Sequence, residues 1–179
     1  MRTDGRHSEL ECFTLGLVWQ LGPCSPYDVR RHMQRSPSTQ WSGSAGAIYP
    51  LVQRLERGGL LKGKALTNGK RARKEYAITP KGLKVLKEWI GPPLPDEAVT
   101  VTYDPLRSRA RFLGVMTPAQ RREWVEAAAG ALEQVAARVA AWRAEYAAGG
   151  DPFADAVSRH GELDTEWRRQ WLKGIESTV

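Results

Sequence analysis

The chain has 179 residues, of which 41% are hydrophobic, 8% aromatic and 26% charged, and its formal net charge at pH 7 is +7. This composition supports a folded core and excludes a chain that is disordered throughout. Residues 1–91 contain 16 Lys and Arg against 7 Asp and Glu, a net charge of +9, whereas residues 92–179 contain 11 against 13, a net charge of −2. A basic half joined to a mildly acidic half predicts a polyanionic partner for the first half only.

Several classes of protein are excluded by what the sequence lacks. Two cysteines, Cys12 and Cys24, are too few for a disulfide framework or a metal site, and Cys12 lies within an apolar helical pattern. The polar N-terminus resembles no signal peptide, and no stretch approaches the roughly 20 apolar residues that cross a bilayer. We therefore expect a cytoplasmic protein that needs no metal or cofactor.

Two helices are predicted before residue 36. Ser8 and Glu11 have the spacing of a capping box, and the helix that follows ends at the Gly-Pro pair of residues 22–23. Ser25 caps a second helix, which has Pro26 at its first position.

A third helix is predicted after a Ser- and Gly-rich connection. Its apolar residues recur at i, i+3, i+4 and i+7: Ile48, Leu51, Val52 and Leu55. Pro50 leaves its start open, because a proline in a helix interior loses a backbone hydrogen bond and clashes with the preceding turn. The helix starts either near Tyr49 or near Ser44 with a distorted first turn, and we favour the second interpretation.

After Leu60 the apolar period shifts toward two, which indicates strands. The runs LLKGKAL and RKEYAIT flank Asn68–Gly69, a dipeptide typical of a tight hairpin turn. Thr79–Pro80 then starts another helix. Basic residues gather on or beside the hairpin: Lys62, Lys64, Lys70, Arg71, Arg73 and Lys74.

The order of three helices and a basic hairpin predicts a winged helix-turn-helix. In such a domain the third helix enters the major groove, whose edges distinguish base pairs, while the preceding helix crosses the DNA backbone. Cations on the wing can contact phosphates or a minor groove. Small residues before the third helix would let backbone amides approach a phosphate closely: Ser42, Gly43, Ser44, Ala45 and Gly46.

The second half is expected to be helical. A Pro-rich connector, with a possible extended piece over residues 99–103, precedes a helix from Pro118 to Ala148, about 46 Å long at 1.5 Å per residue. One apolar stripe of this helix has the spacing of a coiled-coil seam: Val125, Ala128, Leu132, Val135, Val139, Trp142 and Tyr146. A stripe of this length needs a partner helix, and a two-fold dimer would present two recognition helices to a palindromic operator.

Asp151–Pro152 starts a last helical segment, for which a break at Gly161 and a restart at Asp164 are expected. This segment packs either on the long helix or across a dimer, with an apolar face formed by Phe153, Val157, Trp167, Trp171, Leu172 and Ile175. An aromatic group suggests a pocket for a flat aromatic or hydrophobic effector, with plain interface packing as the alternative: Trp142, Tyr146, Trp167 and Trp171.

Three segments resemble the PadR family of bacterial transcriptional regulators: LGLVWQLGPCSPYDVRRHM, AIYPLVQRLERGGLL and KRARKEYAITPKGLKVL. The resemblance covers about residues 10–90. It implies a homodimeric regulator, commonly a repressor and sometimes released from DNA by a small molecule. By motif position it implies phosphate contacts by Tyr27 and Tyr49, a recognition helix that starts within Ser42–Gly46, and a wing at Lys70–Lys74. One departure is Ser25–Pro26, where the family often has a glycine.

The expected fold is therefore mainly α with a β-hairpin wing. Residues 1–91 form the DNA-binding domain, 92–116 a connector and 117–179 the helical dimerisation domain. No catalytic residues are predicted and we expect no enzyme, because His7, His32 and His160 are scattered and the motifs G-x-S-x-G and G-x-x-x-x-G-K are absent. The alternative function is a winged-helix module for protein interaction that binds no specific DNA.

Overall fold

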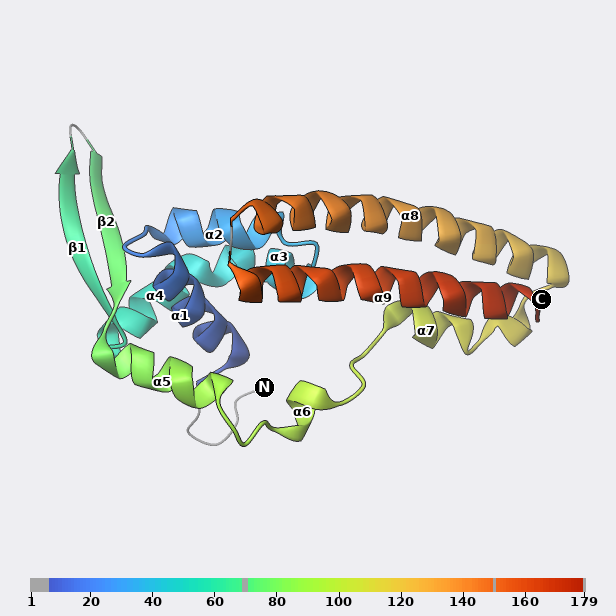
Figure 1. Ribbon diagram of the computed structural model, residues 1–179, viewed down its shortest axis with the longest axis horizontal. Helices are drawn as coiled ribbons and strands as arrows, with labels where there is room; N and C mark the ends of the chain where they lie inside the picture. The colour runs from blue at the N-terminus through green and yellow to red at the C-terminus, as the bar shows by residue number, and fades with distance from the viewer. Residues whose placement is uncertain (1–6, 69–70, 150, 179) are drawn as a thin grey trace. The chain divides into compact units, whose positions relative to one another are not determined.

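The computed structural model describes residues 7–68, 71–149 and 151–178. The chain divides into two compact units, residues 1–100 and 101–179, with a boundary inside the range expected as a connector. Most described residues are helical and the sheet has two strands, which confirms the predicted fold class (Figure 1). None of the described helices is long and apolar enough to cross a membrane.

The first unit contains the predicted helices and hairpin. The predicted caps are confirmed: Ser8 and Ser25 each form a capping box, and the Thr79 hydroxyl accepts from the Gly82 amide. Its elements are α1 (Glu9–Leu21), α2 (Pro26–Arg35), α3 (Thr39–Ser44), the 3₁₀ turn η1 (Ala45–Ala47), α4 (Ile48–Arg57), β1 (Leu61–Asn68), β2 (Arg71–Ile78), α5 (Pro80–Ile90) and α6 (Asp96–Val99).

One core joins α1, α2, α4 and the base of the hairpin. The four residues of the predicted α4 stripe are each at most 2% exposed, and they pack with Leu15, Val29 and Met33 from the other helices. Cys12 and Cys24 are also buried, and this burial raises the pKa of each thiol to about 11. Both cysteines therefore stay protonated at neutral pH and serve as small apolar residues.

The start of the third helix has features of both interpretations that Pro50 left open: a 3₁₀ turn follows Ser44, and the regular α-helix begins beside Tyr49. The α-helix α4 begins at Ile48, and the preceding residues form the 3₁₀ turn η1. Pro50 is thus the third residue of the α-helix, where a backbone N–H would have no carbonyl partner within the helix. The proline costs α4 no hydrogen bond, which explains why the helix tolerates it.

Two short helices were not predicted. The Ser- and Gly-rich connection contains α3, on which Trp41 stacks against Phe13 of α1, with ring centroids 3.8 Å apart and planes 7° apart. The Pro-rich connector contains α6, which ends at Val99, and the rest of the expected extended piece, residues 100–103, has no regular structure. Both helices lie in polar or proline-rich sequence without the apolar spacing that is typical of a helix, and for this reason they were not predicted.

The second unit is built on two long antiparallel helices, α8 (Pro118–Ala148) and α9 (Pro152–Glu176), which lie side by side in Figure 1. The short segments α7 (Pro105–Ala110) and the 3₁₀ turn η2 (Leu113–Val115) precede them. The expected break at Gly161 is wrong, because α9 is continuous. A Cβ on Gly161 would lie 3.1 Å from Val139, so the glycine allows close approach of the two helices.

Arginines link the two long helices through ion pairs. Arg169 of α9 pairs with Glu133 of α8 at 2.7 Å, and Arg143 of α8 pairs with Glu162 of α9. Arg168 pairs at 2.8 Å with Asp104, the buried residue that caps α7. These contacts align α9 along α8 and attach α7 to the same unit.

We predict that Gly82→Ala destabilises the first unit. A Cβ at Gly82 would overlap the backbone carbonyl oxygen of Leu60, which cannot move without breaking its hydrogen bonds to Thr79. Steric overlap of this kind costs about 1–3 kcal/mol. Urea unfolding should give a free energy of unfolding that is lower by that amount.

Gly16→Ala is the matched control in the same unit. Its Cβ would make an ordinary 3.6 Å contact with Leu86, and replacing a helix-interior glycine contributes roughly 0.5–1 kcal/mol of stability. Equal stability of the two variants would contradict the packing described for Gly82.

Candidate nucleic-acid interface

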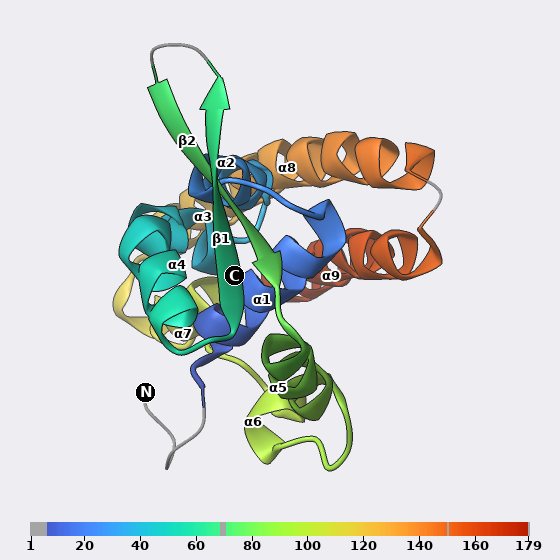
Figure 2. The same cartoon turned by 90° about the vertical axis from the view of Figure 1, so that its left-hand side faces the viewer.

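The wing is an antiparallel hairpin that extends beyond the helices of the first unit (Figure 2). Its strands pair from Leu61 opposite Ile78 to Asn68 opposite Arg71. Of the predicted turn, Asn68 is the last residue of β1, whereas Gly69 lies outside the described residues, as does the predicted wing residue Lys70. The side chain of Arg71 also lies outside the description.

The base of the wing is attached to the segment before α2. Backbone hydrogen bonds join Cys24 and Tyr76 in both directions, at 3.1 and 2.8 Å. Tyr76 is only 5% exposed, so the middle of β2 is part of the core. This attachment places the basic residues of β2 beside the first turn of α2.

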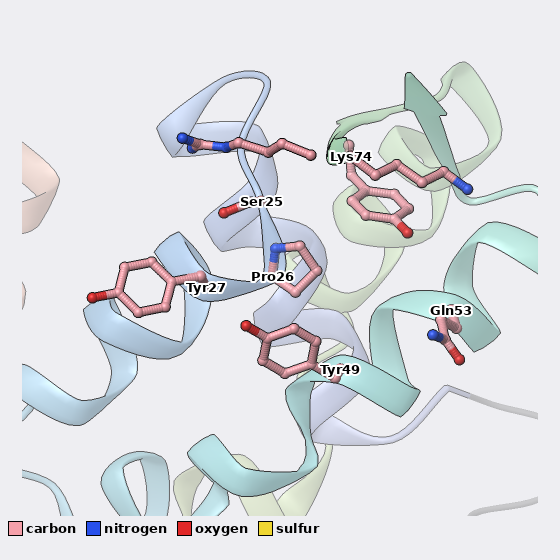
Figure 3. Close-up of a pocket in the computed structure, with 8 residues that line it drawn as sticks. Ser25, Pro26, Tyr27, Tyr49, Gln53 and Lys74 are labelled. Carbon is pink, nitrogen blue, oxygen red and sulfur yellow. The ribbon is translucent and has the colours of Figure 1, made fainter. Parts of the chain in front are cut away.

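A hollow opens where α2, α4 and β2 meet (Figure 3). Tyr27 from α2 and Tyr49 from α4 border it, and their side chains are 57% and 44% exposed. The hollow is lined by Ser25, Pro26, Tyr27, Tyr49, Gln53, Arg73, Lys74 and Tyr76. The structure therefore brings the two predicted phosphate-contacting tyrosines together with two of the predicted wing cations.

The two wing cations at the hollow are held by carboxylates. Arg73 Nη2 lies 2.9 Å from Asp28 Oδ2, and Lys74 Nζ lies 2.8 Å from Glu56 Oε2. The Ser25 hydroxyl donates to Asp28 at 2.6 Å and lowers the pKa of that carboxyl, and the nearby arginines lower it further. Asp28 is therefore ionised at neutral pH and positions Arg73 at the rim.

The helix α4 directs its polar side away from the core. Tyr49, Pro50, Gln53, Arg54 and Arg57 are exposed along α4. The stripe opposite them is buried under α1 and α2. This exposed side adjoins the hollow, since Tyr49 and Gln53 belong to both.

The small residues predicted to start the recognition helix precede it instead. Ser42, Gly43 and Ser44 end α3, and Ala45 and Gly46 belong to η1. The Ser44 hydroxyl donates to the carbonyl of Gln40 at 2.7 Å. The side chains of residues 42, 43 and 45 lie outside the description.

In the second unit, the predicted dimerisation stripe packs within the chain. Val125, Leu132 and Val139 are buried by contacts within a single chain. The partner helix that the stripe needs is therefore supplied by α9, as one of the two interpretations of that segment expected. The other members are partly exposed: Ala128, Val135, Trp142 and Tyr146.

The four predicted effector-site aromatics form two separate pairs. Trp142 and Tyr146 contact each other on α8, with centroids 4.6 Å apart, and Trp167 and Trp171 stack on α9 at 6.3 Å. The ion pair between Arg169 and Glu133 places Trp167 and Trp171 beside the part of α8 around Glu133. Trp142 and Tyr146 lie more than two helical turns further along α8. One chain does not bring all four together.

Sequence reasoning missed three residues of the interface. Asp28 and Glu56 were not predicted to belong to the interface, because their ion pairs join segments far apart in sequence. Gln53 could have been found, because it lies opposite the apolar stripe of α4 in any helix with that spacing. The Gln53 side chain is neutral, so a search for basic residues did not identify it.

The chain is similar in fold to solved PadR proteins. Bacillus subtilis PadR in complex with operator DNA is 18% identical with a TM-score of 0.79, over 95% of this chain and 97% of that chain. The PadR-like transcriptional regulator BC1756 from Bacillus cereus is 21% identical with a TM-score of 0.73, over 99% and 100%. Bacillus subtilis PadR in complex with p-coumaric acid is 18% identical with a TM-score of 0.66, over 93% and 95%. No curated protein sequence matches significantly.

The sequence of the first unit agrees with this likeness. Residues 15–88, from the middle of α1 to the end of α5, match the model of a single family. The match includes the whole hollow and both strands of the wing. Residues 15–88 match the model of the Transcriptional regulator PadR-like family, which confirms the resemblance drawn from the motifs.

Proposed function

We propose that the chain is a sequence-specific DNA-binding regulator, acting in the cytoplasm as a homodimeric repressor on a palindromic operator. The observation that carries the proposal is the hollow, which is lined by two exposed tyrosines and two cations beside the exposed side of α4. Bacillus subtilis PadR, which has the same fold, was solved with operator DNA, and this supports the proposal.

The parts of the winged unit match the parts of a DNA duplex. In our proposal α4 lies in the major groove, and the wing lies along the adjacent backbone. Tyr27 and Tyr49 donate their hydroxyls to phosphates, which fix the register without reading sequence. The net charge of +9 on residues 1–91 strengthens attraction to any duplex and makes binding sensitive to salt.

Replacing either tyrosine should weaken DNA binding without changing the preferred sequence. We expect Tyr27→Phe and Tyr49→Phe each to lower affinity for a duplex selected from a random pool by about tenfold, because a hydrogen bond to a charged group is lost. The slope of log affinity against log salt should stay constant, because no charge is removed. Fluorescence anisotropy titrations at several salt concentrations measure both quantities.

Tyr103→Phe is the control, because Tyr103 is 79% exposed in the second unit and should leave affinity unchanged. The proposal fails if the unaltered protein binds its best selected duplex no more tightly than a scrambled one. That result would instead favour the protein-interaction module.

The homodimer is supported by apolar surface on the second unit. Phe153, Val157 and Trp167 lie on one face of α9 and are 80%, 64% and 52% exposed. Large exposed apolar side chains on one helix face are typical of an interaction surface. We propose that a second copy covers it, together with the partly exposed members of the α8 stripe, so that two winged units reach half-sites one helical turn apart.

The double substitution Phe153→Ser, Val157→Ser should separate the copies. We expect sedimentation velocity to give a dimer for the unaltered chain and a monomer for the variant at the same micromolar concentration. Leu94→Ser, which removes a 57% exposed leucine from the first unit, should remain dimeric. A monomeric unaltered chain, or a dimeric double variant, would contradict the proposed interface.

We further propose that a small aromatic effector relieves repression by binding at the aromatic residues of the second unit. Bacillus subtilis PadR was solved with p-coumaric acid, which supports this class of ligand. In the proposed dimer the Trp142–Tyr146 and Trp167–Trp171 pairs lie at the surface that the second copy covers, where a flat ligand can stack on their rings. Because one chain keeps the pairs apart, each site would use one pair.

p-Coumaric acid should weaken binding to the selected duplex and change tryptophan fluorescence. Trp142→Phe combined with Trp167→Phe should reduce both responses, because the stacking surfaces are smaller. Trp19→Phe, in the first unit, should keep both responses. Unchanged fluorescence and unchanged operator affinity across phenolic acids and hydrophobic cations would rule out this effector site.

A further inference from the structure

The buried stripe of α4 determines which of its side chains face outward. Successive residues of an α-helix are rotated by about 100°. The four buried residues of α4 define the direction of the core, and Gln53 and Arg57 point almost directly away from it. Tyr49 and Pro50 flank this outward direction on either side.

Several exposed residues of α4 already contact other parts of the first unit, which leaves few side chains that could contact bases. Arg54 lies 3.6 Å from Glu11 of α1, and Glu56 is paired with Lys74 of the wing. Tyr49 borders the hollow, and proline has no side-chain donor or acceptor. Gln53 and Arg57 are the outward residues of α4 with hydrogen-bonding groups suited to base edges.

Gln53 is the better placed of the two. Recognition helices contact base edges mainly with their N-terminal residues. Gln53 lies one turn after Tyr49 and lines the same hollow, whereas Arg57 is the last residue of α4. Figure 3 shows Gln53 on α4 one turn beyond Tyr49. In the proposed complex, with phosphates at Tyr27 and Tyr49, Gln53 would face the floor of the major groove.

The chemistry of the side chain identifies its target. A glutamine amide has an acceptor oxygen and a donor NH₂ in one plane. Adenine presents N7 as an acceptor and its N6 amino group as a donor in the major groove, which is the complementary pair. We infer that Gln53 is a specificity-determining residue that reads an adenine in each half-site. The inference rests on the proposed function, because it requires α4 to enter the major groove.

Selection from a pool of randomised duplexes tests the inference on the full chain. The unaltered protein should require an A·T pair at one position of each half-site, with about 5- to 150-fold lower affinity for other pairs. Gln53→Ala should lose the preference at that position alone and keep it elsewhere. Gln53→Glu should shift it toward C·G, because a carboxylate accepts from the N4 amino group of cytosine.

Gln20→Ala, at the exposed end of α1, is the matched control and should select the same duplexes as the unaltered protein. Gln53 is exposed, so thermal unfolding should be alike in all variants. If the unaltered chain selects no sequence, the proposed function fails and the inference fails with it. If it selects an operator and Gln53→Ala keeps the same base preferences, with or without a uniform loss of affinity, the inference alone is overturned.

Discussion

Burial of one face of α4 is the constraint on which the interface depends. Ile48, Leu51, Val52 and Leu55 are held among α1, α2 and the base of the hairpin, so α4 cannot rotate about its axis without exposing them. Fully burying one such side chain contributes roughly 1.5–3 kcal/mol. The same burial fixes Tyr49 at the hollow and Gln53 on the outward face, which links packing directly to recognition.

The hollow also depends on carboxylates that hold its cations in place. Asp28 joins the cap of α2 to Arg73 of the wing, and Glu56 joins α4 to Lys74. Exposed ion pairs of this kind stabilise a fold by little, about 0–1 kcal/mol. Their effect here is on position: they keep the base of the wing beside Tyr27 and Tyr49, where a phosphate would meet cations and hydroxyls together.

Structural features that depend only on residues close in sequence were predicted correctly. The caps at Ser8, Ser25 and Thr79 and the stripe of α4 were all predicted, because each depends on neighbours within a few residues. Contacts between distant segments were beyond reach. The stacking of Trp41 on Phe13 stabilises α3 in a segment that reads as a linker. The α8 stripe indicated a partner helix, but the sequence did not decide between α9 of the same chain and a helix of a second copy.

Amide hydrogen exchange of the full chain, with and without its selected duplex, tests the central claim most directly. DNA that lies on the proposed surface should slow exchange at the start of α2, across η1 and α4, and along β2. Exchange in α5 and on the outward face of α9 should not change on binding DNA. Protection confined to α5 or to the second unit, with none at α4, would contradict the account.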